Sequence, residues 1–352
     1  MIKIVKKSEV AGIRATAYRL TAVMGALICS ALLMLALGHN PVEVFSNIIN
    51  GSVMTKYRLI ETLRRAIPLI MLSLGISVAF KMKFWNIGAE GQLCMGAFGA
   101  SFFALYFPEL PQIVLLPLMF IAAMICGGIW ASIASILKLK FNTNETLVTL
   151  MLNYVALKWI SFLQYNLWRD PEAKGFALIP KFSENAKLPN VFGLHIGWII
   201  ALIFAVIIYI LMKHTKLGYE IEVIGENKNT ANYAGMNLKK VMLTAVFVSG
   251  ALCGATGMIQ ASGVEYTLNE QVSGGMGFTA VITAWLAKLS APAIIVTSFL
   301  FAMLLRGGDF LRVQMQIPSA VSDILQGIIL FFVLGSEFFI QYKFVFTRRK
   351  AS

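Results

Sequence analysis

Residues 213–240, KHTKLGYEIEVIGENKNTANYAGMNLKK, form a hydrophilic segment between two long apolar runs of the chain. Within this segment, 229–234 is followed by Gly235, a pattern that predicts a short helix ended by a glycine just past its last turn. The side chain of Asn227 or Asn229 could cap the start of this helix. A helix on such a loop could dock a soluble partner, and an ordinary solvated loop is the alternative interpretation.

The composition of the whole chain is that of a membrane protein. The 352 residues are 58% hydrophobic and 13% charged, with a mean hydropathy of +0.75, whereas about a quarter of a soluble chain is charged. The net charge of +13 therefore fits lysines and arginines at the cytoplasmic ends of spans better than a nucleic-acid partner. The four cysteines all lie in apolar runs, which indicates small buried side chains, with neither disulfides nor a metal site.

No motif for catalysis is present in the sequence. There is no GxxxxGK[ST] phosphate-binding loop, so this chain is not expected to bind ATP itself. The three histidines are far apart and near predicted span ends, which argues against a metal cluster.

The apolar runs predict an all-α polytopic membrane protein with about ten transmembrane helices, some of them short. The predicted spans cover 20–38, 67–80, 87–107, 113–137, 145–163, 196–212, 241–263, 274–286, 291–305 and 319–339. The first run is too long for a signal peptide and is expected to be an uncleaved helix. Residues 39–65 are expected to lie at the membrane interface or to begin the second span. We therefore assign a basic N-terminus (1–19), one transmembrane domain (20–341) and a basic tail (342–352).

Lysine and arginine are distributed unevenly between the two sides of these spans. With the N-terminus inside, the predicted cytoplasmic side carries roughly twice as many of them as the outer side, as the positive-inside rule expects. Both termini and the loop 213–240 are therefore predicted to be cytoplasmic, and the loop 164–194 extracytoplasmic. The basic group between Lys56 and Arg65 falls on the outer side, contrary to the rule.

Polar residues interrupt the apolar runs at helical spacing. Asn86 is expected to cap the helix that begins there, with Glu90 in its first turn, near the positive end of the helix dipole. Three more sets of polar residues each share one helix face. These sets are Glu145, Thr149 and Asn153; Ser249, Cys253, Thr256 and Gln260, beside Gly250 and Gly254; and Ser319, Asp323 and Gln326.

Polar groups in hydrocarbon need partners, because each unsatisfied group costs several kcal/mol. The stripes could line a translocation pathway, or they could join helices through hydrogen bonds and close glycine contacts. Capping and the helix dipole already account for Asn86 and Glu90 without a substrate. Joining helices is the simpler interpretation for any single residue, whereas the set as a whole favours a pathway.

Six stretches of this sequence resemble one known family. They are FWNIGAEGQLCMGA (84–97), NETLVTLMLNYVA (144–156), VIGENKNTANYAGMN with VSGALCGATG (223–237 and 248–257), GGMGFTAVITAWLAKLSAPA (274–293) and IPSAVSDILQGIILFFV (317–333). They resemble, in order over 63–335, the permeases of bacterial ATP-binding-cassette (ABC) importers of the simple-sugar and nucleoside type. The wider family includes ribose and branched-chain amino acid permeases. The sequence is most similar to the branch served by a Bmp-type lipoprotein, whose characterised members import purine nucleosides.

The resemblance implies a permease without enzymatic activity in the bacterial cytoplasmic membrane. Its implied partners are a cytoplasmic ABC ATPase that binds ATP and Mg²⁺, a second permease that is more often a homologue than a copy, and an extracytoplasmic solute-binding lipoprotein. It implies no cofactor on this chain and no nucleic acid. The residues implied to couple to the ATPase are Glu226, Asn227, Asn229, Ala231, Tyr233, Ala234 and Gly235. The predicted pathway residues are Asn86, Glu90, Gln92, Glu145, Asn153, Gln260, Asp323 and Gln326.

The sequence is also compatible with two other classes of protein. An ion-driven secondary transporter could use Glu145 or Asp323 as its proton site, but such proteins often contain inverted repeats, and none is evident in this sequence. A purely structural scaffold is disfavoured by the polar stripes. Whether the solute is a nucleoside or a sugar stays open. Phe84, Trp85 and Trp285 could stack on either one, or they could anchor the chain at the membrane interface.

Overall fold

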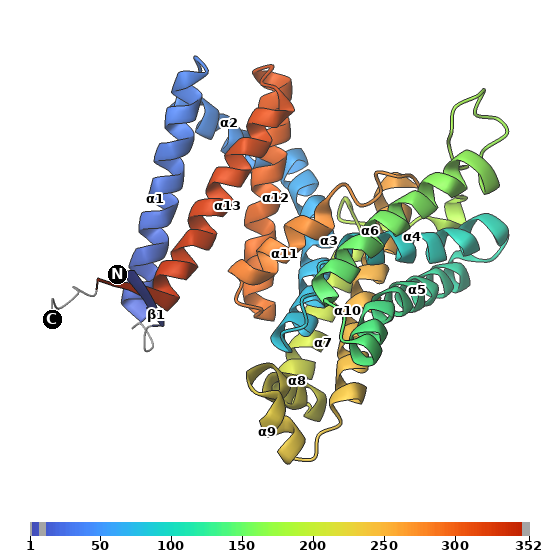
Figure 1. Cartoon of the computed structure of the whole chain (residues 1–352). Coiled ribbons are helices and arrows are strands. Elements are labelled where there is room, and N and C mark those ends of the chain that lie inside the picture. The colour runs from blue at the N-terminus through green and yellow to red at the C-terminus, as the bar shows by residue number, and fades with distance from the viewer. Residues whose placement is uncertain (1, 7–11, 347–352) are drawn as a thin grey trace. The chain divides into compact units, whose positions relative to one another are not determined.

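The computed structural model describes residues 2–6 and 12–346 (Figure 1). The chain divides into two compact units, one made of 1–62 with 303–352 and one made of 63–302. Helices α3 (Lys56–Lys81) and α12 (Ala291–Gln314) each contribute residues to both units. The units are called unit 1 and unit 2 below, and each is described by itself.

Unit 1 is built from the two ends of the chain. Its helices are α1 (Gly12–Ala36), α2 (Pro41–Val53), the start of α3, the end of α12 and α13 (Ser319–Gln341). Strand β1 (Ile2–Lys6) pairs antiparallel with β4 (Tyr342–Phe346), a pairing that the sequence did not predict. A buried cluster that includes Met34, Val44 and Leu311 forms the core.

Residues 56–65 begin the second span, one of the two alternatives expected for 39–65, because α3 runs unbroken from Lys56 to Lys81. Residues 41–53 form helix α2. Asn40 caps it by accepting a hydrogen bond from the Val42 amide at 3.0 Å, and Pro41 occupies its first turn, where proline is favoured. The axes of 20–36 and α2 differ by 114°. Arg58, one of the residues contrary to the positive-inside rule, donates to the Asn50 carbonyl at 2.9 Å and lies 4.4 Å from the centre of the Phe310 ring. These two contacts within unit 1 explain the position of the Arg58 charge, which is one of those contrary to the positive-inside rule.

Unit 2 contains the remaining helices. They are the rest of α3, α4 (Ala89–Tyr106), α5 (Gln112–Phe141), α6 (Glu145–Phe162), α7 (Gly197–His214), α8 (Lys216–Glu226), α9 (Lys228–Tyr233), α10 (Leu238–Gln260), α11 (Met276–Leu286) and the start of α12. The predicted outer loop contains a 3-10 turn (Glu184–Ala186) and a hairpin of β2 (Asn190–Val191) and β3 (Leu194–His195). Short π-helical segments, Leu163–Leu167 and Ala261–Glu265, follow α6 and α10.

Helix α10 lies against both α4 and α5, and glycines allow this close packing. A Cβ atom on Gly254 would lie 2.2 Å from the Ala123 carbonyl oxygen, and one on Gly96 would lie 2.2 Å from the Gly254 carbonyl oxygen. A Cβ on Gly250 would lie 2.5 Å from the Gly127 carbonyl oxygen. Small residues at such contacts let membrane helices approach closely enough for van der Waals packing to hold them. The predicted role of Gly250 and Gly254 in helix packing is confirmed.

Six helices of the described residues are long and apolar enough to cross a membrane, and the bent pair of α1 and α2 could be a seventh. The expected run 291–305 becomes a 24-residue helix. By contrast, the expected run 274–286 becomes the 11-residue α11, about 16 Å long at 1.5 Å per residue, which is shorter than the roughly 30 Å hydrocarbon core. The chain is thus a helical multi-pass membrane protein, and the count of ten spans stays a prediction.

Candidate functional site: the buried polar cluster and the α7–α10 loop

The polar residues at the start of α4 form a buried network. Gly88, and not Asn86 as expected, occupies the N-cap position of α4. The Asn86 side-chain oxygen accepts from the Gly88 amide at 3.0 Å and from the Gln92 amide group at 2.8 Å. Its amide group donates to Gln92 and to the Ser249 hydroxyl of α10, both at 3.1 Å. Asn86 therefore joins the loop before α4 to α10, because one of its partners, Ser249, lies on that helix while Gly88 and Gln92 are close in the sequence.

Glu90 lies in the first turn of α4, as predicted, but its carboxylate is bound by a different helix. It accepts from the Gly275 amide at 2.8 Å and from the Gly277 amide at 2.6 Å. These amides lie at the start of α11, where backbone N–H groups lack partners within the helix and favour a negative charge. A Cβ on Gly277 would lie 2.4 Å from the Glu90 nitrogen, so this approach requires glycine.

Helix α11 is fastened at a second point as well. The Ser73 hydroxyl of α3 donates to the Ala280 carbonyl at 3.0 Å. This bond and the Glu90 carboxylate hold a helix that is too short to span the membrane alone, which explains how it can persist inside the helical core.

The polar stripe predicted on α6 faces the loop before α4, which contains Asn86 and Ile87. Glu145, Thr149 and Asn153 are all buried, so the shared face is confirmed. The Thr149 hydroxyl accepts from the Ile87 amide at 3.2 Å, and Asn153 accepts from the Gly91 amide at 2.8 Å while donating to the Ile87 carbonyl at 2.9 Å. Glu145 forms an ion pair with Lys138. This stripe thus satisfies backbone groups that would otherwise be unpaired in an apolar core.

The remaining pathway candidates lie on α10 and α13. Gln260 is buried at the end of α10, on the helix that carries the buried stripe of Ser249, Cys253 and Thr256. Asp323 is exposed on α13 in unit 1. Gln326 lies on the same helix, and its side chain lies outside the described part of the structure.

One buried cluster brings together four of the predicted pathway residues, namely Asn86, Glu90, Gln92 and Asn153. Each of them forms hydrogen bonds with another member of the cluster or with nearby backbone groups. The arrangement fixes α4, α6, α10 and α11 relative to one another. The bonding partners were missed by sequence reasoning because they lie far apart along the chain. A contact with solute stays a prediction for each of these residues.

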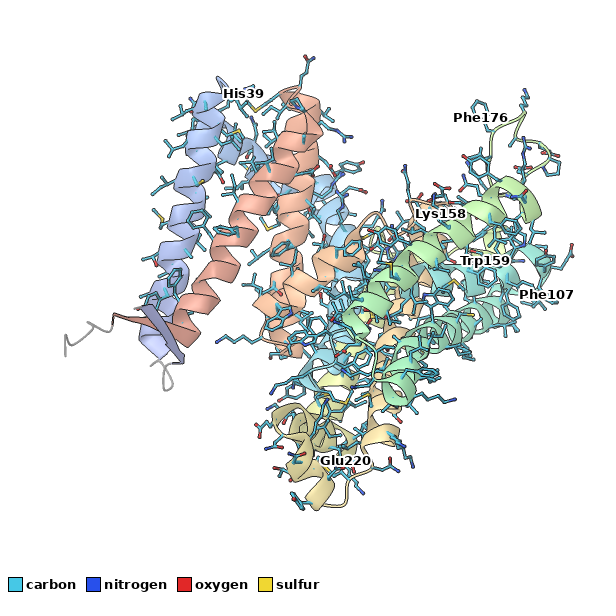
Figure 2. All side chains as sticks on the ribbon, viewed as in Figure 1. His39, Phe107, Lys158, Trp159, Phe176 and Glu220 are labelled. Carbon is cyan, nitrogen blue, oxygen red and sulfur yellow. The ribbon has the colours of Figure 1, made fainter. Side chains whose placement is uncertain are left out.

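The loop between α7 and α10 contains two helices where one was expected. Helix α8, which carries Glu220 in Figure 2, was not predicted. Its buried residues Gly218, Ile221, Ile224 and Gly225 recur at helical spacing, which is the sequence signal that was overlooked. Lys81 at the end of α3 pairs with Glu222 at 3.1 Å. Helix α8 is thereby tied to the membrane-embedded helices.

Helix α9 has the predicted start and end. The Asn227 side chain accepts from the Asn229 and Thr230 amides at 2.9 and 3.3 Å, so Asn227 is the cap and Asn229 is not. Gly235, with φ of 73°, follows the helix, and the Met236 amide closes the turn on the Ala231 carbonyl at 3.0 Å. Left-handed glycine with this closure is a common helix terminator.

Helix α9 presents a projecting surface. Ala231 is fully buried beneath it, whereas Tyr233 is 94% exposed. Glu226, Asn229, Ala234 and Gly235 are exposed as well. An exposed aromatic residue on a capped and anchored helix is suited to contact a protein partner, because Tyr is enriched at protein interfaces.

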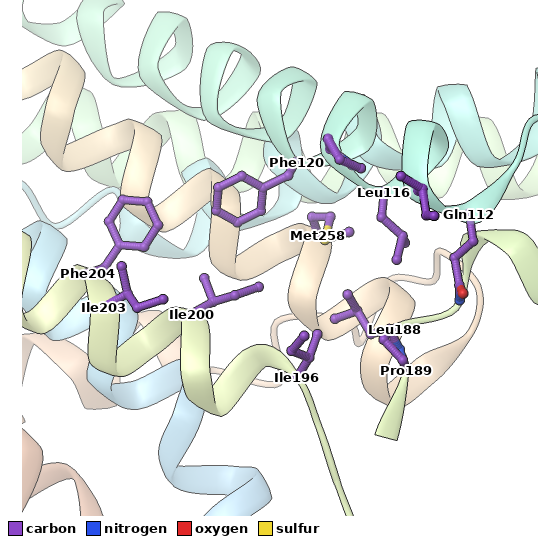
Figure 3. Close-up of a pocket in the computed structure, with 12 residues that line it drawn as sticks. Gln112, Leu116, Phe120, Leu188, Pro189, Ile196, Ile200, Ile203, Phe204 and Met258 are labelled. Atoms are coloured by element: carbon purple, nitrogen blue, oxygen red, sulfur yellow. The ribbon is translucent and has the colours of Figure 1, made fainter. Parts of the chain in front are cut away.

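A cavity of about 490 Å³ lies between α5 and α7 (Figure 3). Its walls are apolar, with Leu116 and Phe120 on α5 facing Ile200 and Phe204 on α7, and Met258 of α10 behind them. Gln112 lies at its edge, and its amide group already donates to the Lys187 carbonyl at 2.8 Å. A cavity with so few polar groups cannot orient a hydrophilic solute. None of the predicted pathway residues lines it.

Long apolar helices joined by buried hydrogen bonds and glycine contacts define a polytopic α-helical membrane protein. Residues 58–334 match the protein family described as "Branched-chain amino acid transport system / permease component". The chain belongs to that family.

Three relatives extend this assignment over most of the chain. A glucose ABC transporter permease, TsgB13 of Haloferax volcanii, is 33% identical over 91% of this chain and 87% of its own. A guanosine ABC transporter permease, NupP of Bacillus subtilis, is 32% identical over 90% and 92% of the two chains. A nucleoside ABC transporter permease, NupB of Lactococcus lactis subsp. cremoris, is 31% identical over 89% of each chain.

The chain is therefore a permease subunit of an ABC transporter, embedded in the membrane by several helices. Such a permease has no enzymatic activity of its own and works with an ATPase and a binding protein.

Proposed function

We propose that this chain forms the translocation pathway of an importer for a nucleoside, purine nucleosides first, or for a simple sugar. The observation that carries this proposal is the similarity over about nine-tenths of the chain to permeases named for guanosine, nucleosides and glucose. Nothing in the structure or in these relatives supports an ion-driven mechanism, in which Glu145 or Asp323 would carry a proton. Glu145 is already paired with Lys138.

Helix α9 and its flanking residues couple the permease to the ATPase in this proposal. The helix is capped by Asn227, anchored by Ala231 and projects Tyr233 into solvent. The ion pair of Lys81 with Glu222 gives α8 a direct connection to α3. A push on α9 is therefore transmitted to the membrane helices through α8, which ends one residue before the Asn227 cap. ATP and Mg²⁺ are bound in the ATPase.

The assembly contains, in addition, a second permease that is a homologue of this chain, and an extracytoplasmic lipoprotein that delivers the solute. The termini and the α7–α10 loop face the cytoplasm of a bacterial cell, with the protein in the cytoplasmic membrane. This orientation rests on the excess of lysine and arginine on that side of the spans.

The solute passes beside Asn86–Gln92, which shapes the path, while Asn153, Gln260, Asp323 and Gln326 line it as the subunits move. The fold is of the ten-span type with short helices near the path. Helix α11 supports this proposal because it is a short apolar helix whose start is held by a buried carboxylate. Discontinuous helices of this kind surround binding sites in several transporter folds.

One pair of aromatic residues, against which Phe80 packs edge-on, is suited to stack on a nucleoside base or on a sugar. Trp85 and Trp285 stack with ring centres 5.3 Å apart and planes within 6°, and both are partly exposed. A stacked pair offers its outer faces to a further flat ring, and base–aromatic stacking contributes about 1–3 kcal/mol per base. Phe84, by contrast, is buried beneath Lys138 and is not available for such a contact.

Co-purification from native membranes in mild detergent tests the proposal. An ATPase subunit and a second permease should be isolated with this chain. ATP hydrolysis by the complex should rise when binding protein loaded with a nucleoside is added, and much less with sugars. A chain that is isolated alone and moves solute in response to an ion gradient would contradict the assignment.

A further inference from the structure

A small cavity of about 180 Å³ lies where α3, α7 and the turn between α11 and α12 meet. Three lysines line it, namely Lys81 at the end of α3, Lys213 in the last turn of α7 and Lys288 in the α11–α12 turn. The other lining residues are Ile208, Tyr209, Met212, Leu289, Ser290 and Ala291. Basic groups and apolar side chains thus meet in one cavity.

The charges in this cavity are only partly balanced. None of the residues that line it, all within the described part of unit 2, is a carboxylate. Lys81 pairs at 3.1 Å with Glu222, which lies outside the lining. Lys213 and Lys288 are exposed to solvent. The site therefore keeps an excess of positive charge that attracts an anion.

The backbone of the α11–α12 turn brings one of these lysines to the cavity. Lys288 and Leu289 both adopt left-handed conformations, with φ of 51° and 56°, which is uncommon for residues other than glycine. Amides of Leu289 and Ser290 donate to the carbonyls of Ala284 and Ala287 at 3.0 and 3.1 Å, which closes the turn. Helix α12 then begins at Ala291, so the positive end of its dipole also lies beside the lysines.

The cavity lies where a lipid headgroup would be found. Helix α7 is apolar from Trp198 to Met212 and ends in Lys213 and His214, and basic residues that follow an apolar span lie at the membrane interface. Tyr209 is 43% exposed on the same side of α7 as the cavity. Basic pockets between membrane helices bind the phosphates of anionic lipids. The apolar lining of Ile208, Met212 and Leu289 is compatible with the adjoining acyl chains.

We propose that this cavity binds the phosphate of an anionic phospholipid through Lys213 and Lys288, with Lys81 held beside them by Glu222. The bound lipid joins the end of α7 to the α11–α12 turn. It thereby links the helix that leads into the α7–α10 loop with the short helix whose start is held by Glu90. The proposal concerns the permease alone and does not depend on the identity of the solute.

Native mass spectrometry of the full chain in mild detergent tests this site, with phosphatidylglycerol and phosphatidylcholine as the added lipids. Wild-type protein should retain phosphatidylglycerol in preference to phosphatidylcholine. The double variant Lys213→Gln with Lys288→Gln should bind phosphatidylglycerol about 25-fold more weakly, because each lysine near a lipid surface contributes about fivefold. Its binding of phosphatidylcholine should not change.

Two variants control for general effects of charge. Lys216→Gln removes a lysine that is 88% exposed, three residues after Lys213 and outside the cavity, and it should bind as the wild type does. The double variant Lys213→Arg with Lys288→Arg keeps the charge and should retain most of the binding. If the double glutamine variant does not fold, the single variant Lys288→Gln should still show a loss of about fivefold.

Two results would overturn the proposal. The first is equal binding of phosphatidylglycerol by the wild type and by the folded glutamine variants. The second is displacement of the lipid by inorganic phosphate at equal concentration, since that would assign the cavity to a free anion and not to a lipid.

Discussion

The buried cluster at the start of α4 and the exposed helix α9 use the same side-chain chemistry in two different ways. In α9 the capping oxygen of Asn227 binds amides two and three residues away. In the cluster, Asn86 binds Ser249, 163 residues away, and Glu90 binds Gly275, 185 residues away. The cap of α9 is thus organised locally, whereas the cluster needs contacts between helices that are distant in the sequence.

The buried cluster and α9 also differ in how much the loss of a hydrogen-bond partner should change the stability of the protein. A polar group that loses its partner in the buried cluster pays the full cost of desolvation, about 1–3 kcal/mol. In α9 water can replace the lost partner, so truncation there costs about 1 kcal/mol at the cap and less elsewhere. Substitutions in the cluster should therefore act on stability, and substitutions in α9 on contact with a partner.

Glu90→Ala should cause the largest loss, about 2–5 kcal/mol, because it leaves the Gly275 and Gly277 amides without an acceptor. The measurement is unfolding in detergent followed by tryptophan fluorescence. Glu226→Ala is the matched substitution at an exposed carboxylate, and it should change stability by less than about 0.5 kcal/mol. Equal stability of the two variants would remove the distinction between the regions.

Asn153→Ala should cost about 1–3 kcal/mol, since it removes one acceptor from the Gly91 amide and one donor from the Ile87 carbonyl. The loss should be smaller than for Glu90→Ala because no charged group is involved. Asn232→Ala, at an exposed position of α9, serves as the comparison in the same unfolding assay. A neutral Asn153→Ala would show that the loop before α4 is held by other contacts.

Asn227→Ala should cost about 1 kcal/mol, a usual value for the loss of a helix N-cap. The loss should be confined to α9, so hydrogen exchange of the Asn229 and Thr230 amides should accelerate while amides of α4 stay protected. Asn227→Asp should preserve the cap. Asn229→Ala, one position inside the helix, should leave exchange unchanged, and the same acceleration in that variant would contradict the assignment of the cap.

Tyr233→Asp should alter stability least, by less than about 0.5 kcal/mol, because the side chain is 94% exposed. It should nevertheless abolish solute uptake, since a charge would be placed at the contact proposed for the ATPase. Ala234→Asp should behave in the same way, and Tyr233→Phe should keep most of the uptake. Normal uptake by a membrane-inserted Tyr233→Asp variant would rule out α9 as the coupling element.

The same distinction explains which features could be read from the sequence. Gly235 was placed correctly as the helix terminator, and Asn227 was one of the two cap candidates, because capping and helix termination depend on neighbouring residues. The common face of Glu145, Thr149 and Asn153 followed from helical periodicity alone. The partners of these residues could not be inferred, because nothing local specifies that Asn153 meets Gly91 or that Glu90 meets Gly277.

Asn86 shows how a local rule fails. Its type and position suit an N-cap, but Ser249 and Gln92 compete for its side chain, and Gly88 takes the cap position. Helix α2 was missed although Asn40 and Pro41 are typical of a helix start, because residues 39–65 were interpreted as a polar stretch at the interface or at the start of the second span. Helix α8 was missed because polar residues obscured the spacing of its buried glycines and isoleucines.

The glycine contacts of α10 restrict how unit 2 can move. At Gly254 and Gly250 a Cβ atom would meet backbone of α5 at 2.2–2.5 Å. Sliding α10 by about one turn would put one of these glycines in the site of the other, but it would bring Val246 or Met258 onto the remaining site, where the backbone leaves no room. Shear between packed helices is one of the two common ways for proteins to change shape, and rotation about hinges is the other. Helices α4, α5 and α10 should consequently travel as one block, and the hinges of any transport cycle should lie at its edges.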